Sequence, residues 1–168
     1  SIVIDDAGAV RKGHWVESVY SRPFIGAGYL HDDNRDKGSA SLEFSAALKS
    51  GRYQVSLAYT AQANRSRRTP ATIRLTDELG SAKTQDIEID QTQAPEQSPW
   101  RKMADVTLPT DQNITVTFRN EGTDGYVIVD AVRFVPLDDA ARRSLAKAND
   151  TDQKPNVAPE SPNPSATK

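Results

Sequence analysis

Hydrophobic and polar residues alternate along much of the first 136 residues, a pattern that predicts β-strands rather than helices. The clearest example is the segment 51–60, in which four large apolar side chains share one face: Tyr53, Val55, Leu57 and Tyr59. The opposite face of this segment is small and polar. Burying each large side chain contributes roughly 1.5 to 3 kcal/mol of stability, so we expect this strand to organise the core.

The same alternation recurs in shorter segments that are separated by turn-forming residues. The candidate strands lie around residues 42–44, 71–75, 87–89, 104–108 and 114–118. Turns are predicted where Gly, Asp, Asn and Pro gather, at residues 50–51, 77–80, 109–111 and 120–125. About eight to ten strands at this spacing, with no helical period between them, predict an all-β antiparallel β-sandwich, of which a jelly roll is one arrangement.

The last apolar run, residues 125–135, contains a carboxylate among β-branched side chains. A run of this length predicts one strand buried on both faces, and period two places Asp130 on the same face as Ile128 and Val132. A buried carboxylate without a partner would cost several kcal/mol. We therefore expect Asp130 to be a structural carboxylate that accepts hydrogen bonds from loop amides or pairs with an arginine; contact with a ligand is the alternative.

The composition changes after Pro136 and divides the chain into three parts. All the aromatic residues (5 Tyr, 4 Phe and 2 Trp) lie before that point, so residues 1–136 are predicted to form the folded domain. Residues 137–148 place acidic residues before basic ones among good helix formers, which predicts one short helix. Residues 149–168 hold four prolines among polar residues, which is typical of a disordered, Pro-rich linker or tail.

Charge and cysteine content argue against several classes of function. The chain has 21 basic and 23 acidic residues, a net charge of −2, which provides no field to attract nucleic acid or an anionic membrane. It has no cysteine, and no apolar run approaches the ~18 residues that span a bilayer. No nucleophile elbow, phosphate loop or zinc-binding helix accompanies the two histidines, so we expect no enzymatic activity. Since the chain opens on a strand-like segment without a leader pattern, we expect it to be an internal piece of a longer precursor.

Several short motifs follow one another in order across residues 1–136. They are residues 2–6 (IVIDD), 13–15 (GHW), 28–29 (GY), 51–55 (GRYQV), 59–61 (YTA), 63–65 (ANR), 90–91 (DQ), Trp100 and residues 125–134 (GYVIVDAVRF). This ordered set resembles the golvesin and xanthan-lyase carbohydrate-binding-like domain. The resemblance implies a galactose-binding-like jelly roll attached to bacterial enzymes such as polysaccharide lyases, peptidases or flavin-dependent oxidoreductases.

The same resemblance implies where the protein acts and what it meets. We expect an extracellular or periplasmic location, with a polysaccharide or glycan and a covalently attached neighbouring domain as partners, and neither nucleic acid nor membrane. Two loops differ from the family pattern. The loop 92–99 carries two prolines where similar domains are rich in glycine, and the segment 32–37 is acidic.

The candidate ligand-binding residues are two aromatic residues and one polar pair: Tyr29, Trp100, Asn64 and Arg65. Proteins hold sugars by flat apolar faces and a few polar side chains, so aromatic residues displayed on loops are the expected contacts. Tyr29 follows a Gly-rich turn, and Trp100 either meets ligand at the rim or covers the end of the core. Arg65 either grips a uronate carboxylate or vicinal hydroxyls together with Asn64, or pairs with a carboxylate such as Asp130.

A metal site is a weaker candidate, and we expect no cofactor. Asp32, Asn34 and Asp36 follow the one, three, five spacing of a calcium loop. Lys37 stands where that loop requires glycine, and no helix is predicted on either side, so an EF-hand is not expected. Asp5 and Asp6, at the end of the first strand, are the other residues that could provide oxygen ligands for calcium.

These observations lead to two functional hypotheses. The first is a non-catalytic carbohydrate-binding accessory module that targets an attached bacterial enzyme to polysaccharide or cell-surface glycan. The second is a structural or interaction domain that packs against its parent enzyme without binding sugar. Convergence of the four candidate residues on one open concavity would favour the first, and a continuous apolar patch of several hundred Å² would favour the second.

Overall fold

The computed structural model of the chain describes residues 1–138, and within these residues the regular structure is almost entirely β. The elements in chain order are β1 (Ile2–Asp5), the 3-10 turn η1 (Asp6–Gly8), β2 (Val10–Lys12), β3 (Val16–Ser18), β4 (Tyr29–His31), β5 (Ser41–Leu48), β6 (Gly51–Ala58), β7 (Thr69–Thr76), β8 (Ala82–Ile89), β9 (Trp100–Leu108), β10 (Gln112–Arg119), β11 (Ile128–Val129) and β12 (Ala131–Pro136). The strands predicted between residues 42 and 118 are all present. The short strands β2, β3, β4 and β11 were not separately predicted, because two or three residues are too few to show alternation.

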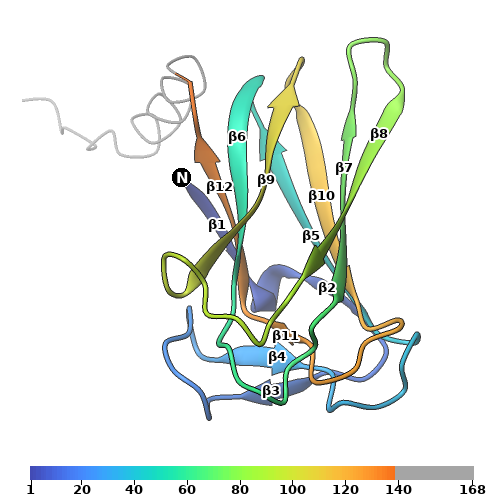
Figure 1. The fold of residues 1–168 in the computed structure, drawn as a ribbon. Helices are drawn as coiled ribbons and strands as arrows, with labels where there is room; N and C mark the ends of the chain where they lie inside the picture. Colours follow the sequence, from blue (N-terminus) through green and yellow to red (C-terminus); the bar gives the residue numbers. More distant parts are fainter. Residues whose placement is uncertain (139–168) are drawn as a thin grey trace, which may run out of the picture.

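Two antiparallel sheets form the walls of a sandwich, and a third small sheet lies at one end (Figure 1). The first wall has the strand order β1-β12-β6-β9, and the second has the order β2-β5-β10-β7-β8. The third sheet, β11-β4-β3, lies at the lower end in this view. The chain crosses repeatedly between the two walls, as a jelly roll requires, so the predicted all-β antiparallel sandwich is confirmed.

The core lies between the two walls and is built as the alternation predicted. The four apolar side chains of the segment 51–60 are all buried: Tyr53, Val55, Leu57 and Tyr59. From the opposite wall, Phe44 and Phe118 meet edge to face with their ring centroids 5.8 Å apart. Consecutive side chains of a strand point to opposite faces, so the intervening residues of β6 face away from this core.

The prediction of one continuous strand over residues 125–135 is wrong. The segment is divided between β11, which pairs with β4 in the small sheet, and β12, which pairs with β1 and β6 in the first wall. Asp130 lies at the division, where its backbone N–H donates to the Ala58 carbonyl at 3.1 Å. Most of the run is buried because it passes from one sheet into another, and each sheet covers part of it.

The predicted helix over residues 137–148 and the predicted tail over residues 149–168 lie outside the described residues, apart from the first two positions. The division of the chain into these three parts therefore stays a prediction. Within the described residues, no helix has the length and apolar character needed to cross a membrane.

Candidate functional site

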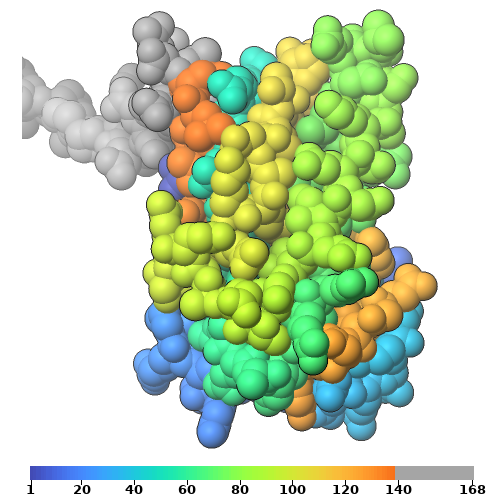
Figure 2. Space-filling view, in the orientation of Figure 1, coloured from blue at the N-terminus to red at the C-terminus, as the bar shows by residue number. Residues whose placement is uncertain are grey.

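A hollow of about 320 Å³ opens on the outer face of the first wall, beside the loop that leads into β9. Three strands and one loop line it: β6 with Gln54 and Ser56, β9 with Trp100 and Lys102, β12 with Arg133, and the loop with Glu96 and Gln97. We call it the Trp100–Arg133 hollow. The loop stands out at the left of the molecule in the space-filling view (Figure 2).

Strand register brings these side chains together. Ser56 pairs with Arg133 on one side and with Lys102 on the other, so its hydroxyl lies between two cations on the floor of the hollow. Two residues further along β6, Ala58 pairs with Trp100, and its small side chain leaves room for the indole. Residues from three strands thus meet at one place, although they are about 30 to 80 positions apart in the sequence.

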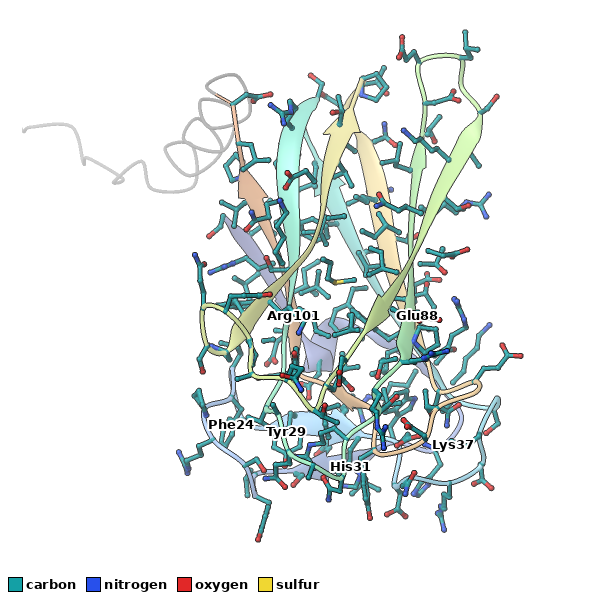
Figure 3. All side chains as sticks on the ribbon, viewed as in Figure 1. Phe24, Tyr29, His31, Lys37, Glu88 and Arg101 are labelled. Atoms are coloured by element: carbon teal, nitrogen blue, oxygen red, sulfur yellow. The ribbon has the colours of Figure 1, made fainter. Side chains whose placement is uncertain are left out.

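A β-bulge decides that Trp100 and Lys102 face outward. Val55 pairs with Ala104, but Ser56 pairs with Lys102, so Met103 is the extra residue in β9. Regular alternation from the buried Ala104 would have turned Lys102 and Trp100 into the core. The residue between them, Arg101, instead points to the other side and donates to the Tyr59 hydroxyl at 3.3 Å (Figure 3).

The Trp100 indole and the Arg133 guanidinium stack on each other, with the guanidinium carbon 4.4 Å from the ring centroid. The backbone holds the indole in place, because Trp100 N donates to the Gln97 carbonyl at 2.8 Å and Gln97 N donates back at 3.1 Å. The loop is tied to β6 as well, since Tyr59 N donates to the Pro99 carbonyl at 3.1 Å. The backbone that carries Trp100 is therefore fixed on both sides, and the stacked pair presents a flat surface.

Two polar atoms in the hollow are buried without a hydrogen-bond partner among the described residues: Ser56 Oγ and Arg133 Nε. Burial also lowers the pKa of the Arg133 guanidinium, and no acidic neighbour opposes that shift. A buried polar atom left unpaired costs about 1–3 kcal/mol, so such atoms are exceptional and call for a partner. The lining of the hollow therefore includes one hydroxyl and one cationic N–H whose hydrogen-bonding capacity is unused within the described residues.

Tyr29, Asn64 and Arg65 lie close to one another, and none of them lines this hollow. Tyr29 lies at the lower end of the sandwich (Figure 3). Arg65 is buried and its three nitrogen groups donate within the protein, to Thr60 O at 3.2 Å, Asn64 Oδ1 at 3.0 Å and Ser21 Oγ at 3.3 Å. The Tyr29 hydroxyl accepts from Ser21 N at 3.2 Å. These contacts hold the segment before β4 against the loop after β6.

Trp100 is thus separated from the other three predicted site residues. Tyr29 lines a different hollow, of about 190 Å³, beside Asp5 and Asp6. The four candidates do not converge on one concavity, because Arg65 is committed to a carbonyl, an amide and a hydroxyl rather than displayed to solvent. Their assignment as ligand-binding residues stays a prediction.

Asp130 takes one of the two structural roles predicted for it. Its Oδ2 accepts a hydrogen bond from the backbone N–H of Ile25 at 2.8 Å, so it ties down a loop amide. Burial raises the pKa of Asp130 to about 7; the hydrogen bond from Ile25 opposes this rise, and the nearby Asp6 and Asp5 add to it. Burial and Asp5 likewise raise the pKa of Asp6 to about 7. Arg65, the predicted alternative partner, makes none of its hydrogen bonds to this carboxylate.

The segment around Asp32, Asn34 and Asp36 is organised by a lysine. Asp32 is fully buried and accepts from Lys37 Nζ at 2.7 Å, Asn120 Nδ2 at 3.1 Å and Val127 N at 3.0 Å (Figure 3). Its carboxylate therefore joins three separate segments. Across residues 1–138, no group of three or more acidic, histidine or cysteine side chains is placed to hold a metal ion.

Sequence signals for the hollow were present but ambiguous. Trp100 was predicted, whereas the strand residues Ser56, Lys102 and Arg133 were not, because polar residues on the outer face of a strand normally face water. The one available signal for Arg133 was its place in a largely apolar run, three positions after Asp130.

Comparisons with known proteins agree with this fold. The family model described as "Golvesin C-terminal domain" matches residues 2–136. The xanthan lyase of Bacillus sp. (strain GL1) is 32% identical over 144 residues, which make up 82% of this chain and 15% of that enzyme. The chain therefore spans about a seventh of the length of this relative.

Two solved structures are similar as well. A Paenibacillus xanthan lyase superposes with a TM-score of 0.70 and 27% identity, over 81% of this chain and 13% of that enzyme. A family 35 carbohydrate-binding module from Clostridium thermocellum superposes with a TM-score of 0.57 and 16% identity, over 79% of this chain and 95% of the module. At that identity the second likeness concerns the fold alone. In the xanthan lyase, the similar region is a small part of the whole enzyme.

Proposed function

The chain belongs to the Golvesin C-terminal domain family, and from this premise we propose that it is a non-catalytic accessory module that binds a polysaccharide or cell-surface glycan for an attached bacterial enzyme. The observation that carries the proposal is the Trp100–Arg133 hollow, where a stacked planar pair borders two buried polar atoms that lack partners. Similarity to a region of xanthan lyase supports the polysaccharide, and an extracellular or periplasmic location belongs to the same proposal.

The chemistry of the hollow suits a sugar. A pyranose ring presents apolar C–H groups on its faces and hydroxyls at its edge, so it needs a flat surface with hydrogen-bonding groups beside it. The planar Trp100–Arg133 pair offers the surface, and Ser56, Gln54 and Gln97 offer donors and acceptors. One ring bound in so open a site is expected to bind weakly, on the order of millimolar, or about −4 kcal/mol.

The lining of the hollow supports binding rather than cleavage. Glycoside hydrolysis ordinarily uses two carboxyl groups that face each other across the bond. Among the described residues that line the hollow, one carboxylate is present, that of Glu96, and it belongs to an exposed residue on the loop. The described residues of the hollow therefore include no pair of carboxyl groups, one protonated and one ionised, of the kind that acid–base catalysis uses.

The rival hypothesis, a domain that only packs against its parent enzyme, needs a continuous apolar surface. The large hydrophobic residues that are exposed within residues 1–138 lie on separate segments: Val3 on β1, Val10 on β2, Val19 and Tyr20 before β4, and Leu79 in the turn after β7. These residues are separated along the chain rather than gathered in one run, which we take as support for the binding module.

Affinity gel electrophoresis of the full 168-residue chain tests the proposal. Gels that contain xanthan, other acidic polymers or neutral polymers should retard the protein, and the Trp100→Ala variant should lose at least about tenfold in affinity because the flat surface is gone. The matched control is Trp15→Phe, since Trp15 lies outside the hollow and its indole N–H donates to the Lys12 and Ser41 carbonyls. Absence of retardation on every polymer, or equal retardation of Trp100→Ala and wild type, would contradict the proposal.

A further inference from the structure

We infer that the Trp100–Arg133 hollow selects sugars that carry a carboxylate, with the Arg133 guanidinium as the group that receives it. The inference rests on the proposed function and names the ligand class of the same site. It depends on three features of the hollow: a cation without a counterion, a second cation on the other side of the floor, and a hydroxyl between them.

Arg133 has no counterion within the described protein. None of the ion pairs formed among residues 1–138 includes it, and its one recorded contact is the Trp100 ring. Its Nε is buried and makes no hydrogen bond. A guanidinium in this state has given up hydration without gaining a partner, and a carboxylate is the ligand group whose planar geometry matches its donors best.

Stacking makes Arg133 a better receptor for an anion. The indole of Trp100 covers one face of the guanidinium, whose carbon lies 4.4 Å from the ring centroid, and limits its rotation, while the residue lines the hollow. A cation held in one orientation loses less conformational freedom when it binds. A neutral sugar would satisfy the Nε–H with a hydroxyl but would leave the charge uncompensated.

The floor of the hollow extends the recognition beyond one group. Lys102 lies across Ser56 from Arg133 and forms an ion pair with Asp105 at 2.9 Å, half exposed to solvent. An exposed ion pair of this kind is weak and can be exchanged for a ligand. A uronate could thus place its carboxylate on Arg133 and a neighbouring ring hydroxyl on Ser56 Oγ, with Lys102 adding positive potential.

Glu96 gives the inference a further test, because its negative charge opposes the binding of a carboxylate. It lines the hollow from the loop and is exposed, so it repels a bound carboxylate through solvent rather than by direct contact. Removing its charge should therefore strengthen binding of an acidic sugar. A site for neutral sugars would lose a hydrogen-bond acceptor and bind more weakly instead.

The test compares each of two acidic polymers with an uncharged form of the same polymer. Polygalacturonate and xanthan are each paired with their carboxyl-reduced forms, in which every –COO⁻ has become –CH₂OH, and affinity is measured with the full chain. The acidic form should bind about tenfold more tightly than the reduced form at low salt, and the difference should shrink as ionic strength rises. Arg133→Gln should abolish the preference, and Glu96→Gln should increase it by about two- to threefold.

Arg133→Lys serves as the matched control, since it keeps the charge but loses the planar fork, and it should retain part of the preference. If Arg133→Gln does not fold, Lys102→Gln should still lower the preference and Glu96→Gln should still raise it. Equal binding of acidic and reduced polymers, or a weakening by Glu96→Gln, would overturn the carboxylate preference and leave the proposed function standing. Binding to no polymer of either kind would overturn both.

Discussion

At the scale of single residues, the protein handles its buried charges in three different ways. Asp32 is neutralised by Lys37 at 2.7 Å. Asp130 is held by one loop amide and close to two other carboxyl groups. Arg133 is covered by an indole and left without a counterion. Two of these arrangements belong to the fold, and the third is the one that a ligand could complete.

Asp130 should make the protein less stable as the pH rises. Its pKa is about 7 in the folded protein, above the ordinary value of 3.8, so between these values the folded state keeps a proton that the unfolded state has lost. The free energy of unfolding should therefore fall between about pH 4 and pH 7 and level off above, by about 1.4 kcal/mol for each unit of raised pKa.

Urea unfolding at a series of pH values checks this, with Asp130→Asn as the comparison. The amide keeps an oxygen for Ile25 N and cannot ionise, so the variant should show a shallower slope. Asp6 should leave a residual slope, because its pKa is also about 7. An identical pH dependence in wild type and Asp130→Asn would show the prediction to be wrong.

At the scale of elements, two irregularities determine where side chains point. The bulge at Met103 reverses the faces of β9, and the division at Asp130 passes the last apolar run from the small sheet to the first wall. The sequence correctly predicts the strands between residues 42 and 118 and the buried face of β6. It could not predict the bulge. Once one residue of β9 is unpaired, the alternating pattern no longer fixes which residues N-terminal to it face the core and which face solvent.

The segment before β11 illustrates how closely the connections pack. Tyr126 forms a parallel bridge with Arg65, and Ser66 N donates to the Tyr126 carbonyl at 2.9 Å. A Cβ added at Gly125 would lie 2.6 Å from the carbonyl carbon and oxygen of Arg65, which are backbone atoms that cannot easily move. Glycine at this position is therefore required by close approach.

Gly125→Ala should lower the free energy of unfolding by about 1–3 kcal/mol, since the two backbones must separate to admit the methyl group. Thermal or urea unfolding measures the loss. The matched variant is Gly8→Ala, whose Cβ would meet only the end of the Ile4 side chain at 3.2 Å. We expect this variant to stay within about 0.5 kcal/mol of wild type, and equal losses in both would count against the explanation.

At the scale of the whole molecule, the lower end of the sandwich differs from the outer face of the first wall in what its polar side chains do. The lower end, with the small sheet and its loops, is held together by buried hydrogen bonds such as those of Arg65 and Asp32. The hollow lies on the side of the first wall, where β6, β9 and β12 are neighbours. A ligand there meets three strands as well as one loop, and strands hold their side chains more rigidly than loops do.

Because the Trp100–Arg133 hollow is shallow and open, joining two copies of the chain should strengthen binding to a polymer considerably. Two copies of the chain joined by a flexible linker should bind an acidic polymer about a hundredfold more tightly than one copy, because the second contact becomes intramolecular. Affinity gels of the single and the tandem protein measure the gain. A tandem that carries Trp100→Ala in one copy should bind like the single protein, and a tandem gain that survives this change would place the binding elsewhere.

The sequence by itself determined the β-sandwich, the core face of β6 and the burial of Asp130, and it made Trp100 a candidate ligand contact. It could do so because alternation and composition can be read from the order of residues in one chain. Only the tertiary structure decided that Trp100 faces outward, that Arg133 stacks on it and that Ser56 lies between two cations. The physical reason is that period two sets which residues share a face, whereas long-range pairing and one bulge set which face meets the solvent and which strands are neighbours.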